Sequence, residues 1–300
     1  MILYFNQGGK LTVVKEKVFN LERDIQKIFE ENLIEIMAYE VVKSEFSVKD
    51  RRIDTLAFDN QNNAFIIIEY KRDKNNSVFD QGMTYLSLML ENKADFIVAY
   101  NESLNRSLKL KEIEWDQTRV VFVSTSFTDI QIRATNFKDI AIELWEITQY
   151  DNNIIAINPI KKTPSAESIK PIARRSNVLK NVSKEIKVYT EQDHLIKASE
   201  STVELYEKFK TAILNLQSGI EIEPKKVYIA FKKTKNILYI VVQNKSLKIL
   251  ILAGNGELND TKKIGQDATK ERWGNGSYKI LVKDDSNLEY IMSLIRQVIE

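Results

Sequence analysis

The sequence contains no cysteine and one histidine, His194. Without cysteine the chain can form no disulfide framework, thiolate nucleophile, iron–sulfur cluster or zinc ribbon, and a reducing compartment fits this composition. One histidine also excludes a histidine-rich zinc site and a histidine pair for acid–base cleavage of RNA. The chemistry must therefore use other side chains, among which 44 lysines and arginines and 42 aspartates and glutamates are abundant.

Long apolar runs are missing as well. The long ones, such as residues 64–68 and 249–253, are far shorter than the roughly 20 residues that a membrane-spanning helix needs. Residues 1–17 carry charged side chains where a secretory signal would have its apolar stretch. No G-x-x-x-x-G-K-[ST] pattern occurs, which argues against a nucleotide-binding P-loop. We therefore expect a soluble, cytoplasmic protein.

The length of 300 residues favours two domains, and charge is divided unevenly between the two halves. Residues 1–150 contain 19 basic and 24 acidic side chains, which leaves 25 basic and 18 acidic ones in residues 151–300. The net charges are −5 and +7. The second half is therefore the available source of cationic surface for a polyanionic partner.

Basic charge and helix breakers are concentrated directly after the midpoint of the chain. We therefore divide the sequence into a first domain over residues 1–160, a basic linker over residues 161–198 and a second domain over residues 199–300. The linker is either a flexible, solvated connection or a segment that contacts phosphates. Its basic residues and prolines include Lys161, Lys162, Pro164, Pro171, Arg174 and Arg175.

The hydrophobic pattern of the first domain predicts both helices and strands. Apolar side chains at helical spacing predict helices, and short apolar runs bounded by turn residues predict strands. The expected helices cover residues 20–37, with Asn20 as the cap, and 77–92. The expected strands cover residues 40–48, 52–58, 64–71, 96–100, 119–124 and 140–147. This α-β-β-β-α-β order predicts an α/β fold with a mixed sheet flanked by helices.

The pattern of the second domain predicts a smaller α+β fold. Its first helix is expected over residues 201–216, with Ser201 and Glu204 in the capping-box arrangement, and a closing helix over residues 288–299. The strands between them are expected over residues 226–231, 237–242, 247–253 and 278–282.

One strand end brings together groups that could do chemistry. Glu69 and Lys71 close the apolar run at residues 65–68, and side chains two positions apart in a strand point to the same face. Asp54 lies in the preceding strand, and a tight hairpin can bring it beside Glu69. Two carboxylates repel each other unless a cation joins them, and such hard oxygen ligands suit Mg²⁺ or Mn²⁺. A nearby lysine can position a metal-bound water.

An acid-x-lysine triplet alone has little weight, because the sequence repeats it at Glu185, Glu223 and Asp260. The triplet of Glu69 differs in ending a strand of buried type and in following a strand with an embedded acid. The next helix adds an amide and a phenol, Gln81-x-x-x-Tyr85, on one face. The alternative interpretation is that these charges are solvated at a strand end.

Asp54, Glu69-x-Lys71 and Gln81-x-x-x-Tyr85 together resemble the PD-(D/E)XK nuclease superfamily, in its RecB-like branch with a Q-x-x-x-Y motif. The resemblance covers about a third of the chain. It implies a restriction-endonuclease-like fold, a divalent metal held by the acidic pair and a lysine that serves the nucleophilic water.

The resemblance also implies a metal-binding glutamate on the first helix. We assign this role to Glu22, with Glu31 and Glu35 as alternatives. One departure from the family pattern is Ile53 before Asp54, where the pattern has proline, and it does not affect the metal ligands.

The same motifs resemble a family of uncharacterised microbial proteins that join such a domain to a carboxy-terminal domain of unknown function. In the second half the resemblance rests on residues 202–206, 226–231 and 273–276. It implies an architecture and not an activity.

The sequence therefore predicts a Mg²⁺- or Mn²⁺-dependent nuclease that hydrolyses DNA phosphodiester bonds, in defence or repair. Asp54, Glu69 and Glu22 are the expected metal ligands. Lys71 is expected to assist the water, and Gln81 and Tyr85 to order the site. Two alternatives are a nucleic-acid-binding module of the same fold without turnover and a protein-interaction component directed by the second domain. A homodimer is a further possibility.

Overall fold

A computed structural model of the chain describes residues 2–71, 77–163, 165–173, 176–233, 235–254, 256–268 and 277–299. Pro164, Arg174, Arg175 and residues 273–276 of the sequence analysis lie outside the described residues. The chain divides into two compact units, Met1–Val188 and Tyr189–Glu300. Among the described helices, none has the length and apolar character needed to cross a membrane.

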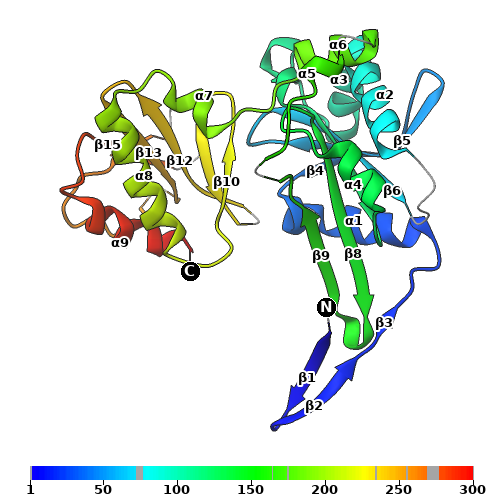
Figure 1. The fold of residues 1–300 in the computed structure, drawn as a ribbon, viewed down its shortest axis with the longest axis horizontal. Coiled ribbons are helices and arrows are strands. Elements are labelled where there is room, and N and C mark those ends of the chain that lie inside the picture. Colours follow the sequence, from blue (N-terminus) through cyan, green and yellow to red (C-terminus); the bar gives the residue numbers. More distant parts are fainter. Residues whose placement is uncertain are drawn as a thin grey trace. The chain divides into compact units, whose positions relative to one another are not determined.

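The first unit contains a mixed sheet, a separate hairpin and several helices (Figure 1). Its strands are β1 (Leu3–Gln7), β2 (Lys10–Val14), β3 (Glu16–Lys17), β4 (Glu40–Val48), β5 (Arg51–Asp59), β6 (Ala64–Lys71), β7 (Arg119–Ser124), β8 (Ile142–Tyr150) and β9 (Ile155–Ile160). Its α-helices are α1 (Glu22–Met37), α2 (Val78–Glu91), α3 (Lys93–Leu104), α4 (Asp129–Thr135), α5 (Lys170–Ala173) and α6 (Asn177–Glu185). Short 3-10 turns are η1 (Leu110–Glu112), η2 (Trp115–Gln117) and η3 (Asp151–Asn153).

The described strands of the main sheet follow the order β3-β8-β7-β6-β5-β4, and β9 also pairs with β8. Strands β6, β7 and β8 run parallel, whereas β4, β5 and β6 are antiparallel neighbours. Helix α1 packs on one face, where Phe29 meets Ile68 and Tyr70 in one apolar cluster. Helices α2, α3, α4 and α6 contribute to the cluster on the other face. This arrangement confirms the predicted α/β fold with a mixed sheet flanked by helices.

Strand β6 lies in the interior of the main sheet and is buried along almost its whole length. Seven of its eight residues are buried, as expected for a strand with helices on both faces. The predicted strands 40–48, 64–71 and 119–124 are confirmed with the same bounds, and Ser77 caps α2 through its side chain. The cap of helix α1 is Leu21 and not the predicted Asn20. The backbone N–H of Leu21 donates to Asp24 Oδ2 at 3.1 Å.

The prediction of a strand over residues 96–100 is wrong, because this segment lies inside helix α3. Phe96 and Tyr100, one helical turn apart, are buried, whereas Val98 between them is 51% exposed. A five-residue apolar run fits a strand or a helix equally well, and the run alone does not reveal which faces are covered.

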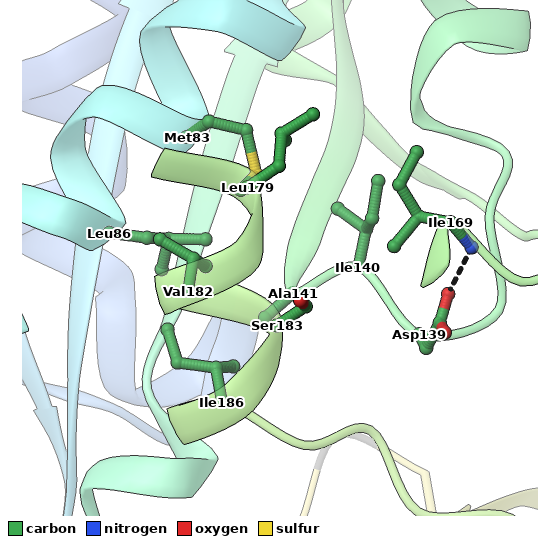
Figure 2. Close-up of a pocket in the computed structure, with 10 residues that line it drawn as sticks. All are labelled: Met83, Leu86, Asp139, Ile140, Ala141, Ile169, Leu179, Val182, Ser183 and Ile186. Atoms are coloured by element: carbon green, nitrogen blue, oxygen red, sulfur yellow. Dashed lines mark hydrogen bonds between the residues drawn. The ribbon is translucent and has the colours of Figure 1, made fainter. Parts of the chain in front are cut away.

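The boundary between the two units, after Val188, lies inside the predicted linker over residues 161–198, and the part of that segment before it belongs to the first unit. Helix α6 packs against α2 in the first unit, with Val182 and Ile186 in the apolar cluster of that unit. Figure 2 shows both side chains beside Leu86 of α2, in a pocket with mostly apolar walls. Leu179, Val182 and Ile186 lie at helical spacing and pack against the first unit, although the sequence around them is basic.

The second unit places helices on an antiparallel sheet. Its elements are α7 (Glu191–Leu195), α8 (Glu200–Leu214), β10 (Glu221–Pro224), β11 (Ile229–Lys232), β12 (Asn236–Gln243), β13 (Ser246–Leu252), β14 (Gln266–Asp267), β15 (Ser277–Val282) and α9 (Leu288–Ile299). The described strands follow the order β10-β11-β12-β13-β15-β14, and α8 and α9 share an apolar cluster with one sheet face. The cap of α8 is Ser199 and not the predicted Ser201. The closing helix 288–299 is confirmed.

Gly82 lets α2 lie close to the main sheet. A Cβ atom at this position would lie 2.6 Å from Ile142 Cδ1 and 3.2 Å from Phe122 Cε2. Both distances are shorter than ordinary contacts, so a side chain here would force the helix away from β7 and β8.

We therefore expect Gly82→Ala to lower the free energy of unfolding by about 1–3 kcal/mol, because overpacking in the core outweighs the better helix propensity of alanine. Urea denaturation followed by circular dichroism measures this change. Adding Ile142→Val, which removes the clashing Cδ1 atom, should recover part of the loss. Equal stability of Gly82→Ala and the unchanged chain would contradict the close approach.

Candidate active site

The structure brings Asp54, Glu69 and Lys71 together at one end of the β5–β6 hairpin. The antiparallel register pairs Thr55 with Ile68, so the next position places Asp54 opposite Glu69. Ile68 packs toward α1, and the alternation of side chains turns Glu69 toward α2 on the other face. Residues opposite each other in a sheet share a face, so both carboxylates lie on the α2 side.

Glu69 is a buried carboxylate whose two oxygens differ in their hydrogen-bond partners. Its side chain is only 5% exposed. Oε1 accepts from Lys71 Nζ at 2.8 Å and from Gln81 Nε2 at 2.7 Å. Oε2 is also buried and has no hydrogen-bond partner among the described residues. A buried, charged oxygen without a partner is costly, which makes Oε2 the atom of this site most in need of a cation.

Asp54 is placed by the backbone of the neighbouring strand. Its Oδ2 accepts from the N–H of Tyr70 at 3.0 Å. Burial, and next the negative charge of Glu69, raise the pKa of Asp54 from 3.8 to about 6. Two carboxylates that repel each other in this way favour a shared proton or a shared cation.

Gln81 and Tyr85 connect α2 to the hairpin. Gln81 Nε2 donates to Glu69 and also lies 3.2 Å from the Tyr85 hydroxyl, which in turn donates to the carbonyl of Arg52 at 3.1 Å. Burial, and next the charge of Glu69, raise the pKa of Tyr85 and keep it neutral.

The predicted third ligand, Glu22, belongs to helix α1. Glu22 lies at the exposed start of α1, and within the described residues no three carboxylate or histidine side chains are grouped to hold a metal. The alternative Glu31 is exposed on α1, where it lies 3.9 Å from Lys27.

The α1 residues that do contact the hairpin were missed in the sequence. Gln26 Nε2 donates to the carbonyl of Asp54 at 3.0 Å, and Thr55 Oγ1 donates to Glu30 Oε1 at 2.5 Å. Their positions beside the apolar stripe of Ile25 and Phe29 are the signal that could have identified them.

A second glutamate–lysine pair with the same spacing provides a comparison. Glu223 in β10 accepts from Lys225 at Oε1 and from Lys232 at Oε2, both at 2.6 Å. Both oxygens of Glu223 are therefore neutralised by lysines, unlike those of Glu69. The same sequence triplet thus gives a closed ion-pair cluster in the second unit and an incompletely satisfied carboxylate in the first.

Comparison with known proteins gives a full-length relative. An uncharacterized protein of Haemophilus influenzae is 50% identical over 301 residues, and the match covers 100% of each chain. Residues 191–298 match the family model described as a domain of unknown function, DUF5655.

Solved structures resemble parts of the chain at low similarity. A complex of EndoMS with dsDNA2 has a TM-score of 0.27 and 16% identity over 38% of this chain and 40% of that one. A repair endonuclease from Pyrococcus abyssi has a TM-score of 0.21 and 18% identity over 38% and 42%. SfsA of Pyrococcus furiosus in complex with Ca²⁺ has a TM-score of 0.25 and 15% identity over 52% and 68%. The chain spans less than half the length of the first two proteins.

The raised pKa of Asp54 predicts a pH-dependent change in stability. The folded protein holds this proton more tightly than the unfolded chain does, so stability is lost as pH rises from about 4 to above 6. Asp54→Asn keeps an acceptor for Tyr70 and removes the charge. In EDTA we expect it to raise the free energy of unfolding at pH about 7.5 by about 1–2 kcal/mol, after allowance for solvent screening, and to change it little at pH about 4.

Urea denaturation at the two pH values measures this difference. Asp50→Asn, which alters a carboxylate that is 84% exposed, is the control and should leave stability unchanged at both. A loss of stability in Asp54→Asn at neutral pH would show that Asp54 is stabilised as an anion in the metal-free protein.

Proposed function

We propose that this protein, which belongs to the same family as the Haemophilus influenzae protein, is a metal-dependent nuclease that hydrolyses phosphodiester bonds in DNA. We place its first unit in the PD-(D/E)XK superfamily, in the RecB-like branch, on the motifs Asp54, Glu69-x-Lys71 and Gln81-x-x-x-Tyr85. The observation that carries the proposal is the state of Glu69: Lys71 and Gln81 hold one oxygen, while the other is buried and has no partner among the described residues.

The residues present fit a hard divalent cation. Glu69 Oε2 offers a buried anionic oxygen, and the carboxylate of Asp54 lies beside it at a raised pKa. Oxygen donors of this kind suit Mg²⁺ or Mn²⁺, which keep several water ligands. When bound, such a cation lowers the pKa of a water molecule and neutralises charge that develops on a phosphate.

The side chains around the carboxylates orient the site. Lys71 Nζ is fixed by Glu69 at 2.8 Å with its side chain only 13% exposed, so its positive charge is held next to the acidic pair. There it can bind an oxygen of the attacking water or of the phosphate. Gln81 sets the rotamer of Glu69, and Tyr85 fixes the strand two residues before Asp54.

DNA is proposed as the substrate on the resemblance of these motifs, and the basic second half supplies charge for it. Residues 151–300 carry the net charge of +7 that the acidic first half lacks. Defence and repair both require enzymes of this class, and the assignment to one of them depends on the DNA structure that is cut.

Direct metal binding tests the site independently of turnover. We expect Mn²⁺ titrated into the full-length chain in a calorimeter to bind, and Glu69→Gln to weaken binding at least tenfold, because the amide replaces the anionic oxygen. Glu223→Gln is the matched control, since it alters the other Glu-x-Lys pair, and should leave binding unchanged. Equal binding by all three proteins would place the metal elsewhere.

Cleavage tests the activity itself. With Mg²⁺ or Mn²⁺, the unchanged chain should cut DNA in a panel of supercoiled, linear, single-stranded and branched substrates, with RNA as the comparison. Lys71→Met should lower the rate by roughly 100-fold or more because a positioned charge at the reacting phosphate is lost. Lys93→Met, which removes a lysine paired with Glu185 at 2.9 Å, is the control.

The outcomes of the cleavage assay separate the candidate functions. DNA binding without cleavage under any metal would support the module without turnover. Full activity in Lys71→Met would assign that lysine a structural role.

A further inference from the structure

The N-terminal hairpin exposes an apolar sheet face. In the described residues, β1 and β2 form a two-stranded sheet that is separate from both larger sheets. Figure 1 shows it in blue at the start of the chain. Gly8 and Gly9 take positive φ angles of 60° and 86° in its turn. A two-stranded hairpin is only marginally stable in water unless a face or an edge is covered.

The two faces of this hairpin differ. The register places Tyr4 opposite Val13 and Asn6 opposite Leu11, so these side chains share one face, and alternation adds Ile2. We call this set the Tyr4 face. Its apolar members are strongly exposed: Ile2 72%, Tyr4 52%, Leu11 59% and Val13 53%. The opposite face contains Phe5, Lys10 and Val14, and the side chain of Val14 is buried.

We infer that the Tyr4 face is a homodimer interface, against which the same face of a second copy packs. The hairpin contains one charged residue over residues 2–14, Lys10, and it lies on the opposite face. A nucleic acid or an anionic membrane would require cations here. An uncharged face can meet its own copy without repulsion, and a two-fold axis makes one patch complementary to itself.

The exposed area fits a small dimer. Four large apolar side chains, each more than half exposed, provide roughly 500 Å² per copy, so a two-fold contact covers about 1,000 Å². This is the lower bound for a specific interface. Packing two hairpins face to face would also supply the covered face that a two-stranded sheet needs.

Sedimentation equilibrium of the full-length chain from about 1 µM to about 200 µM tests the inference. We expect a monomer–dimer equilibrium in which Tyr4→Lys and Val13→Lys raise the dissociation constant at least tenfold. Phe5→Lys is the matched control, because Phe5 is adjacent in sequence and 48% exposed but lies on the opposite face. A monomer at every concentration, or an equal loss in all three variants, would overturn the inference.

Cross-linking gives a second test that does not introduce charge. The chain has no cysteine, so Tyr4→Cys, Leu11→Cys and Phe5→Cys each provide a single thiol. Mild oxidation should yield disulfide-linked dimers of Tyr4→Cys and Leu11→Cys well above the level of Phe5→Cys. Equal cross-linking of all three would contradict a face-specific contact. A Tyr4→Ala variant that stays monomeric like the unchanged chain but loses affinity for DNA or for anionic vesicles would assign the face to that partner instead.

Discussion

The buried carboxylate of Glu69 is the constraint on which the arrangement of the first unit depends. It lies near the end of a strand that helices cover on both faces, where a charge without partners would oppose folding. Lys71 and Gln81 compensate one oxygen, and Gln81 reaches it because Gly82 lets α2 approach the sheet. Stability alone would favour a second partner for the other oxygen. The second unit shows that a glutamate with this spacing can have one, so the unsatisfied oxygen of Glu69 is suited to a ligand.

The strand order of the main sheet places Asp54 beside the buried carboxylate of Glu69. Strand β6 is parallel to β7 and antiparallel to β5. Because only a short turn joins β5 to β6, Asp54 of β5 lies opposite Glu69 of β6. The backbone N–H of Tyr70 fixes Asp54, and Gln26 of α1 binds the carbonyl of Asp54 from the other face. The two acids are thus held by rigid elements on both sides of the sheet. A preformed pair of this kind can bind a cation with little reorganisation.

The sequence predicted which side chains lie together at the end of β6 better than it predicted the elements around them. Strand β6 and helix α2 could be identified because an apolar run ends in charges and Ser77 caps the following helix, so Asp54, Glu69, Lys71, Gln81 and Tyr85 were placed together. Segment 96–100 was assigned to a strand because a short apolar run contains no information about what covers it. Glu22 was chosen by position on α1, but helical phase turns Gln26 and Glu30 toward the hairpin. The helix α6 in the predicted linker depends on tertiary contacts with α2.

We propose that Glu69 and Asp54 share a divalent cation through the oxygen of Glu69 that has no partner among the described residues. The most direct measurement is anomalous X-ray diffraction from crystals of the full-length chain grown with Mn²⁺. We expect an anomalous peak in contact with Glu69 Oε2 and the carboxylate of Asp54, with Lys71 still bound to Oε1. Well-ordered crystals in saturating Mn²⁺ with no peak at these two carboxylates, or with Lys71 moved to bind Oε2, would contradict it.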